Sequence, residues 1–268
     1  MARLSINETT TYRWSFEEDV MAYHAAGIGA IGVWRQKLSD FGEVKGAELL
    51  EETGLAAAHL FWVGGFTGSD GRSYRESLQD AQEALKVAAE IKAPTVIVYS
   101  GARAGHTFNH AKRLIKGALA ELAPQAAELG LTLAVEPMHP GCAEQWTFLT
   151  TLDETLELLD AVANDRAKLV FDTYHLGQQP EAVERIGQIV DRIALVQLGD
   201  AQGPPDGEQN RCLLGQGTVP LKQIVDALQA AGYDGDYDVE LLGEDVEPLD
   251  YGQLIDNAKT VFAELLGG

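Results

Sequence analysis

Four apolar segments of the sequence each end on a polar side chain that could bind a metal ion. The segments are LTLAVEP, AKLVFD, IALVQLGD and DYDVELLG, and the polar residues are Glu136, Asp172, Gln197 and Glu240. Three carboxylates gathered in one apolar cavity would repel one another and resist desolvation unless a cation were bound among them. The set therefore predicts a site for one divalent ion, with Gln197 as the fourth ligand.

The ligand types favour a hard cation. Oxygen donors without a cysteine suit Mn²⁺, Mg²⁺ or Co²⁺ better than structural zinc. Mn²⁺ is our first choice, and Mg²⁺, Co²⁺ and Zn²⁺ stay open. Taken singly, a carboxylate at a strand end more often caps a helix or anchors a loop. Asp200 lies beyond the apolar run of its segment and is a weaker candidate than Gln197, and we expect Glu244 and Asp245 to be solvated.

Apolar segments rich in β-branched and aromatic residues alternate with amphipathic ones along the whole chain. The first group predicts eight strands: RLSIN, AIGVW, AAAHLFW, TVIVYSG, LTLAVEP, AKLVFD, IALVQLGD and DYDVELLG. The second group predicts helices over residues 16–26, 39–52, 73–91, 109–129, 152–163, 180–189, 220–231 and 248–266. We expect Ser15 to cap the first helix, Gly54, Gly130 and Gly232 to follow helix ends, and Pro220 to lie in a first helical turn.

This alternation indicates an α/β fold. Strands that are apolar on both faces are typical of a parallel sheet covered by helices, which forms either a barrel or an open doubly wound sheet. Eight units of about thirty residues favour the (β/α)₈ TIM barrel, and INETTTYRW after the first strand lacks the G-x-G-x-x-G of dinucleotide-binding folds. No proline- or glycine-rich linker divides the chain, so we expect a single domain over residues 1–268. The strand ends of a barrel meet at one rim, which would bring the predicted metal ligands together.

The composition argues against several classes of partner. The chain has 268 residues with 41 acidic and 20 basic side chains, a formal charge of −21, which opposes binding to nucleic acids and anionic membranes. Cys142 and Cys212 show no metal-type spacing, so we expect a reducing, cytoplasmic setting. The start MARLSINETT lacks the apolar core of a signal peptide, and no run approaches the roughly 18 to 20 apolar residues of a membrane span. We therefore expect a small-molecule partner.

Five segments also carry a family likeness: LAVEPMHP, LVFDTYHLG, ALVQLGDAQ, NRCLLGQGTVPL and YDVELLGE. They resemble the xylose isomerase-like TIM barrels, the sugar phosphate isomerases and epimerases, over nearly the whole chain. This family includes ketose 3-epimerases, hydroxypyruvate isomerase and inosose dehydratase. The resemblance implies that Glu136, Asp172, Gln197 and Glu240 bind one divalent ion. Ketose 3-epimerases have a histidine where this chain has Gln197, whereas relatives of hydroxypyruvate isomerase have a glutamine there.

The same resemblance implies roles for three further residues. His175, in D-x-x-H spacing, and Arg211, before LGQGTVP, match family positions that bind substrate oxygens. His139 lies in an E-P-x-H-P segment that resembles the C-glycoside deglycosidase branch, in which a metal-bound keto-sugar undergoes elimination. Basic residues are few near the strand ends, which favours an unphosphorylated or weakly charged sugar.

Other ring side chains lie near predicted strand ends. His106 and His110 are spaced i, i+4 after the fourth strand; we include His106 among the substrate-binding candidates and expect His110 to cap the helix or face solvent. His59 is more readily explained as a satisfied strand histidine than as a catalyst. Trp34, at the end of the second strand, is the tryptophan we expect to contact substrate, because sugar faces stack on aromatic rings.

These residues suggest a mechanism. Isomerising or epimerising a sugar requires removal of a proton beside a carbonyl, and a bound metal would stabilise the resulting enediolate as a Lewis acid. Glu136 and Glu240 would exchange the proton as base and acid, with His139 as an additional proton carrier. The sequence thus predicts a divalent-metal-dependent isomerase or epimerase acting on a ketose, keto-sugar or related polyol.

Two other enzyme classes and a sugar-binding protein are alternatives to this prediction. A metal-dependent lyase that eliminates the aglycone from a 3-keto-glycoside shares the proton abstraction, and His139 favours it. An endonuclease IV-like phosphodiesterase would need a histidine-rich multi-metal cluster and a basic face, which six scattered histidines and a charge of −21 do not provide. A non-catalytic sugar-binding barrel would not need the carboxylate set. The sugar, the ion and a homo-oligomeric state stay open.

Overall fold

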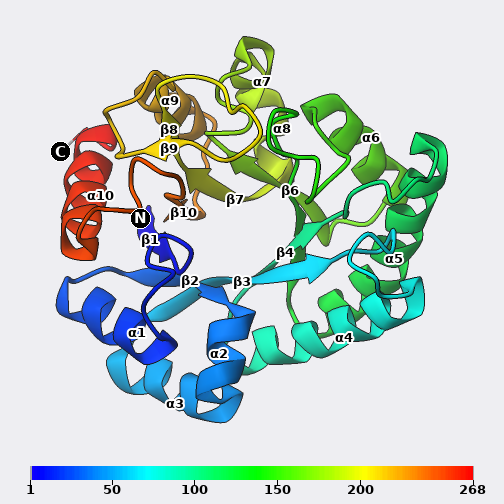
Figure 1. The fold of residues 1–268 in the computed structure, drawn as a ribbon, viewed down its shortest axis with the longest axis horizontal. Coiled ribbons are helices and arrows are strands. Elements are labelled where there is room, and N and C mark those ends of the chain that lie inside the picture. The colour runs from blue at the N-terminus through cyan, green and yellow to red at the C-terminus, as the bar shows by residue number, and fades with distance from the viewer. Residues whose placement is uncertain (1, 268) are drawn as a thin grey trace.

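The computed structural model describes residues 2–267, and its centre is a closed barrel of eight parallel strands (Figure 1). The strands are β1 (Arg3–Asn7), β2 (Ala30–Trp34), β3 (Ala56–Gly64), β4 (Thr95–Tyr99), β5 (Thr132–Val135), β6 (Ala167–Asp172), β7 (Ile193–Leu198) and β10 (Asp236–Val239). Around the barrel they follow the order β1, β10, β7, β6, β5, β4, β3, β2, and every neighbouring pair is parallel. The predicted strands and the (β/α)₈ TIM barrel are confirmed.

Helices form a ring outside the strands (Figure 1). They are α1 (Phe16–Ala25), α2 (Arg35–Phe41), α3 (Glu43–Thr53), α4 (Tyr74–Glu90), α5 (Phe108–Glu128), α6 (Leu152–Val162), α7 (Pro180–Glu184), α8 (Ile186–Ile189), the short 3₁₀ helix η1 (Val190–Arg192), α9 (Leu221–Ala230) and α10 (Tyr251–Leu265). The single helix predicted over 39–52 is wrong, because Gly42 has φ +108°, outside the helical range, and separates α2 from α3. The segment 180–189 likewise forms two short helices.

Most of the predicted helix boundaries are confirmed. The hydroxyl of Ser15 accepts the N–H of Glu18 (3.3 Å) and the Glu18 carboxylate accepts the N–H of Ser15 (2.8 Å), a reciprocal cap at the start of α1. Three helices are followed by a glycine with positive φ, at Gly54, Gly130 and Gly232. Pro220 differs from the prediction, because it takes the capping position before α9 and not a position within its first turn.

Two groups of apolar side chains stabilise the fold. A large cluster lies between the strands and the surrounding helices. A smaller cluster is formed by Phe61, Ile97, Ala134, Val170 and Leu195. Ala134 precedes Glu136 by two residues and Val170 precedes Asp172 by two, and residues two apart on a strand point to the same face. The polar layer of the predicted site therefore lies directly next to this apolar layer inside the barrel.

A polar cluster shares the barrel interior on the side of β1, β10 and β3. The buried carboxylate of Asp238 is 2.6 Å from the hydroxyl of Ser5, 3.0 Å from Nδ2 of Asn7 and 2.7 Å from Nε2 of His59. His59 is thus paired inside the barrel, as expected from the sequence. Gly32 faces this pair, and a Cβ at that position would overlap His59 Nε2.

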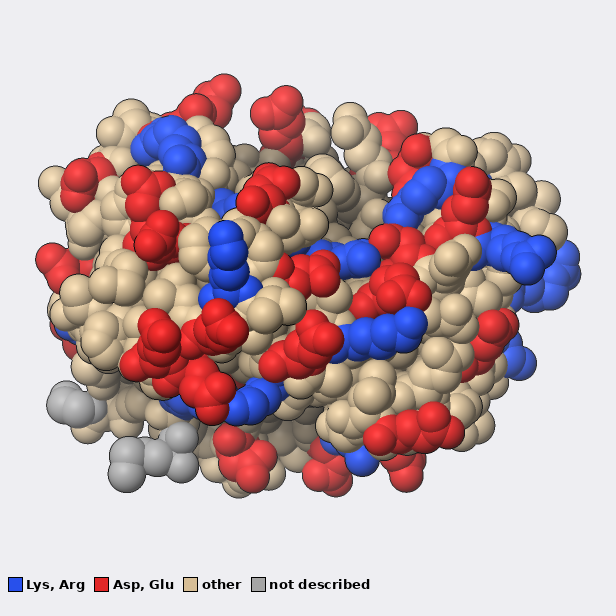
Figure 2. Space-filling view, turned by 90° about the horizontal axis from the view of Figure 1, so that it is seen from below, with Lys and Arg blue, Asp and Glu red and all other residues tan. Residues whose placement is uncertain are grey.

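The described residues include no helix that is long and apolar enough to cross a membrane. On the face drawn in Figure 2, basic side chains are interspersed with acidic ones. Proteins that bind nucleic acid gather their basic residues in one patch or stripe. This face offers no such continuous basic surface.

The close fit at Gly32 gives a test of the fold. Gly32→Ala should lower the free energy of unfolding by about 1–3 kcal/mol, because the added methyl group forces His59 or Asp238 to move. The measurement is urea unfolding followed by circular dichroism. Gly187→Ala in α8 is the matched control, since a Cβ there meets no atom within 4 Å. Equal stability of the two variants would contradict the packing described here.

Candidate metal and substrate site

The ends of β5, β6, β7 and β10 bring the four predicted metal ligands into one region. Glu136 and Glu240 each lie one residue beyond their strands, whereas Asp172 and Gln197 lie within theirs. All four side chains are buried, with exposed fractions of 0% to 7%. The amide of Gln197 donates from Nε2 to Oε2 of Glu240 over 2.9 Å. The result is an oxygen-rich cluster shielded from water.

His175 faces the same cluster. Its Nε2 lies 3.9 Å from Oε1 of Glu136 and 3.9 Å from Oδ2 of Asp172, and one donor atom from each of these residues lies within 4.8 Å of the others. The backbone N–H of His139 donates to Nδ1 of His175 (3.1 Å), so the neutral ring carries its hydrogen on Nε2. Burial lowers the pKa of His175 to about 3, which keeps the ring neutral. This orientation suits a donor to substrate oxygens better than a metal ligand.

Arg211 supplies the positive charge of the cluster. Its Nη2 lies 2.9 Å from Oδ2 of Asp172 and 3.4 Å from Oε2 of Glu240, and its side chain is fully buried. The guanidinium carbon also lies 4.4 Å from the centroid of the Tyr174 ring. Arg211 is thereby fixed between two of the predicted ligands.

A small hairpin outside the barrel delivers this guanidinium. Its strands β8 (Asp200–Ala201) and β9 (Arg211–Cys212) pair antiparallel. The Asp200 carboxylate accepts the N–H groups of Gly215 (2.9 Å), Gly217 (3.0 Å) and Val219 (3.2 Å). Asp200 therefore anchors the chain beyond the hairpin, in line with the sequence reading that ranked it below Gln197 as a ligand.

The carboxyl groups of the cluster differ in their affinity for protons. Burial, reinforced by the charges of Glu240 and Asp172, raises the pKa of Glu136 well above its usual value. Burial also raises the pKa of Glu240, although Arg211 opposes this. For Asp172 burial acts in the same direction, but Arg211 outweighs it and the net effect holds the pKa below the usual value. Asp172 stays ionised, while Glu136 and Glu240 hold protons more readily.

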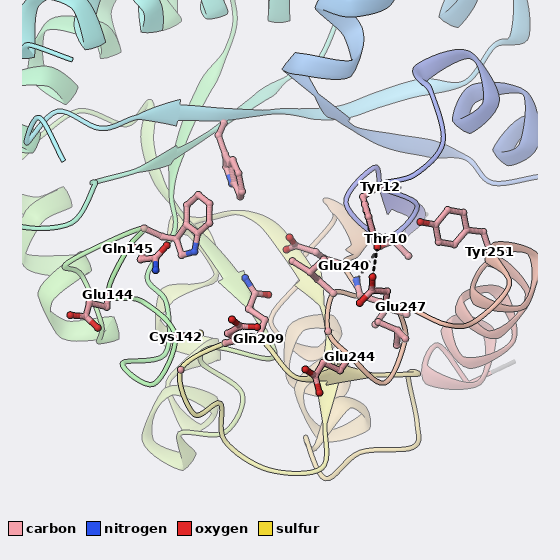
Figure 3. Close-up of a pocket in the computed structure, with 18 residues that line it drawn as sticks. Thr10, Tyr12, Cys142, Glu144, Gln145, Gln209, Glu240, Glu244, Glu247 and Tyr251 are labelled. Atoms are coloured by element: carbon pink, nitrogen blue, oxygen red, sulfur yellow. Dashed lines mark hydrogen bonds between the residues drawn. The ribbon is translucent and has the colours of Figure 1, made fainter. Parts of the chain in front are cut away.

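A cavity of about 430 Å³ opens beside the cluster and reaches Glu240. In Figure 3, Glu240 and Gln209 lie near its middle, with Gln145 on one side and Tyr12 on the other. Its lining contains no lysine, arginine or histidine among the described residues but contains Glu144, Glu208, Glu240, Glu244 and Glu247. The cavity is therefore acidic, which disfavours anionic ligands.

None of the four predicted substrate-binding residues belongs to the lining of this cavity, and of the predicted metal ligands only Glu240 does; the four are Trp34, His106, His175 and Arg211. Nε2 of His106 is 3.2 Å from the backbone oxygen of Thr67, in the loops that follow β3 and β4. Trp34 is partly exposed, donates its backbone N–H to Glu8 (2.7 Å) and stacks on Phe61.

His139 meets the site through its backbone. Its N–H orients His175, as described above, while its own Nδ1 accepts the N–H of Gly141 (3.1 Å). Burial lowers the pKa of His139, so its ring is more readily neutral than that of a free histidine. Like Glu136, His139 is not part of the cavity lining.

The loop after β1 makes contacts that the sequence analysis missed. The hydroxyl of Thr9 lies 3.3 Å from Oε1 of Glu240. The hydroxyl of Thr10 donates to the backbone oxygen of Val239 (3.1 Å) and accepts the N–H of Leu241 (3.0 Å). These threonines hold the chain on both sides of Glu240. The signal was present in NETTT, three hydroxyl groups directly after a predicted strand end.

Comparison with known proteins shows the family to which the chain belongs. A family model for the xylose isomerase-like TIM barrel matches residues 21–261. The chain belongs to this family. An inosose isomerase from Halalkalibacterium halodurans is 24% identical over 209 residues, which is 75% of this chain and 72% of that protein. A D-psicose 3-epimerase from Enterocloster bolteae is 27% identical over 118 residues, 44% of this chain and 36% of that protein.

Solved structures show the same xylose isomerase-like fold. The crystal structure of the IOLI protein, described as binding a zinc atom, superimposes with a TM-score of 0.84 at 21% identity and covers 98% of this chain and 97% of its own. At this identity the likeness establishes the fold. The two relatives named above are an isomerase and an epimerase.

The donor set of this xylose isomerase-like barrel fits a divalent ion. Oε1 of Gln197 is buried and has no hydrogen-bond partner within the described part of the chain. A buried acceptor without a partner is destabilising unless a ligand binds it. Together with the carboxylates of Glu136, Asp172 and Glu240 it offers the oxygen ligands that such ions prefer. Among the described acidic, histidine and cysteine side chains, however, the group with donor atoms within 4.8 Å of one another is Glu136, Asp172 and His175, and it does not include Glu240.

Replacing one ligand tests this fit. Mn²⁺ at one hundred times its Kd should raise the free energy of unfolding of the wild-type protein by about 2.7 kcal/mol. Glu136→Gln should lose most of this stabilisation, because it replaces one of the carboxylate ligands. The measurement is thermal unfolding with Mn²⁺ and with EDTA. Glu244→Gln, at an exposed position on the cavity rim, should keep the full shift. If Glu136→Gln kept it as well, Glu136 would not be a ligand.

The raised pKa of Glu136 predicts an unusual pH dependence for the protein in EDTA. Once the pH exceeds the pKa that Glu136 has in the unfolded protein, the unfolded protein has lost this proton while the folded protein still holds it. The contribution of Glu136 to the free energy of unfolding is therefore fully present below its pKa in the unfolded protein, and it is lost as the pH rises through its pKa in the folded protein. The advantage of Glu136→Gln over wild type in urea unfolding should grow as the pH rises above the value at which Glu136 titrates in the unfolded protein. A stability difference that does not change with pH would refute the raised pKa of Glu136.

Proposed function

We propose that this protein is a divalent-metal-dependent isomerase or epimerase acting on an unphosphorylated ketose, keto-sugar or cyclic polyol ketone. One observation supports this above the others. Glu136 and Glu240 are buried carboxyl groups that reach one cluster from β5 and β10, which β6 and β7 separate in the barrel. Two such carboxyl groups can remove a proton at one place on a bound sugar and return it at another.

The remaining residues of the cluster bind and orient the substrate in this proposal. Asp172, kept ionised by Arg211, anchors the guanidinium, whose N–H groups already donate to Gln209, Asp172 and Glu240. Arg211 therefore holds the carboxylates in place, while the Nε2–H of His175 donates to substrate oxygens. Thr9 and Thr10 hold Glu240 in place. A divalent ion bound by Glu136, Asp172, Gln197 and Glu240, with Mn²⁺ as first choice, would supply a Lewis acid for the carbonyl oxygen.

The cavity and the relatives support the substrate class. Among residues 2–267, five glutamates and no basic side chain line the cavity, so a phosphate group would be repelled there. The likeness to an inosose isomerase supports a cyclic polyol ketone, and the likeness to a D-psicose 3-epimerase supports a ketose. Cys142 and Cys212 are both free and buried, which supports a reducing cytoplasmic setting.

The lyase alternative ranks behind this proposal. It would use the same metal and proton abstraction, and its distinguishing residue was His139. The His139 ring accepts a hydrogen bond from Gly141 and does not line the cavity. The likeness to an inosose isomerase and a D-psicose 3-epimerase therefore ranks the isomerase or epimerase first.

Exchange of solvent deuterium tests the proposed function. The Mn²⁺-loaded protein, incubated in D₂O with an inosose or with D-psicose, should place deuterium on the carbon beside the carbonyl and form an isomeric product, detected by mass spectrometry. EDTA should abolish the exchange. Glu240→Gln should fold normally and lose a factor of about 10² to 10⁴ in rate, the typical contribution of one general acid or base.

A control variant and two possible results complete this experiment. Glu128→Gln should exchange at the wild-type rate, since its side chain is exposed at the end of α5 and outside the cavity lining. An unchanged rate in Glu240→Gln would remove Glu240 from the mechanism. Absence of exchange with every ketone tested would refute the enzyme assignment and favour a sugar-binding barrel.

A further inference from the structure

The cavity has an aromatic end as well as a polar one. Trp62, from β3, and Trp146, from the loop after β5, both line it, and their ring centroids lie 4.6 Å apart at an interplanar angle of 37°. Both tryptophans are partly exposed. Glu240 and Gln209 belong to the polar part of the same lining (Figure 3). The Trp62–Trp146 pair therefore forms an apolar wall continuous with the proposed reaction site.

Trp62 is supported from behind by other rings. Its ring lies 6.2 Å from Tyr99, 5.9 Å from Phe61 and 6.3 Å from Trp34, measured between centroids. The register between β3 and β4 shifts between Leu60 and Val63, and such irregularities re-aim side chains next to functional sites. Trp62 is thus held toward the cavity by the packing of its neighbours.

Trp146 is held through its backbone. Its carbonyl accepts the N–H of Gly101 (3.0 Å), and its own N–H donates to Ala143 (2.9 Å). The next residue, Thr147, bonds through its hydroxyl to Ser100 over 2.7 Å. Both halves of the wall are therefore fixed before any ligand arrives, and a fixed surface loses little conformational freedom on binding.

The charge of the cavity restricts what this wall can bind. Five glutamates and no basic side chain among the described residues line the cavity, so an anionic group would be repelled. Aromatic surface left partly exposed in a concave site favours an apolar or aromatic partner. A cavity of about 430 Å³ also falls in the range that encloses ligands larger than one six-carbon sugar.

We propose that the substrate is a sugar or cyclitol ketone that carries an uncharged apolar ring, with the polyol part at Glu240 and the ring against Trp62 and Trp146. The assignment of the polyol part rests on the proposed function, whereas the ring subsite rests on the tryptophan pair. The pair is then a specificity element and takes no part in proton transfer.

Two glucosides without a ketone test the subsite independently of turnover. Phenyl β-D-glucopyranoside should bind the Mn²⁺-loaded protein about tenfold more tightly than methyl β-D-glucopyranoside, because aromatic pairing and burial contribute on the order of one tenfold step in affinity. Isothermal calorimetry gives both constants. Trp146→Leu should reduce the ratio of the two affinities to near one. The ratio isolates the ring, since general damage to the site weakens both ligands.

A control and two outcomes complete the test. Trp14→Leu carries the same substitution at a ring that lies outside the cavity lining and packs edge-on against Tyr251. Tyr251 lines the cavity but makes no aromatic pair with Trp62 or Trp146, so Trp14→Leu should keep the tenfold ratio. Equal affinities for the two glucosides in the wild-type protein would overturn the subsite, even if deuterium exchange establishes the proposed function. A phenyl preference that Trp146→Leu removes would establish the subsite, even if no ketone exchanges deuterium.

Discussion

The buried contact between Arg211 and Asp172 is the interaction on which the site depends. Three acid groups enter a cluster with almost no access to water, and a charge buried without a partner is strongly destabilising. The guanidinium compensates Asp172 at 2.9 Å and Glu240 at 3.4 Å. Several features around it serve this placement. Tyr174 packs on its face, and Gly199 leaves the space that a Cβ would take from it. The unequal proton affinities of the carboxyl groups follow from where this one cation lies.

Glu240 depends on a second set of contacts from the polar part of the interior. Nδ2 of Asn7 donates to Asp238 (3.0 Å), and the Thr9 hydroxyl lies 2.8 Å from Oδ1 of Asn7 and 3.3 Å from Glu240. A continuous hydrogen-bonded series thus connects His59, at its far end, with Glu240. The other side of the interior is apolar from β3 to β7. The barrel therefore combines an apolar half that contributes hydrophobic stability with a polar half that orients one carboxyl group.

The sequence predicted the fold and the cluster because both follow from local patterns. Side chains two residues apart on a strand point to the same face, so Glu136 points into the barrel as Ala134 does. Closure of the barrel then brings the ends of the strands together. The contact of Thr9 with Glu240 joins residues 231 positions apart, and no local pattern specifies such a pair. The meeting of Trp62 with Trp146 depends in the same way on loop paths. The split of the helix predicted over 39–52 depended on the conformation of Gly42, which amphipathic periodicity does not reveal.

The β8–β9 hairpin has a consequence for how such a barrel can change over evolution or by design. Asp200 at its first strand and Arg211 at its second are each fixed by buried hydrogen bonds, while residues 202–210 run between them over the cavity and contribute Gly207, Glu208 and Gln209 to its lining. Gln209 accepts a hydrogen bond from Nε of Arg211 (2.8 Å) and Asn210 accepts one from Tyr174 (2.7 Å), so these two residues belong to the fixed part. Residues 202–208 can be lengthened, shortened or exchanged without removing a hydrogen bond to the guanidinium. The hairpin thus separates the part of the chain that selects the ligand from the part that acts on it, so that new specificities can be tried on a reaction centre that stays intact.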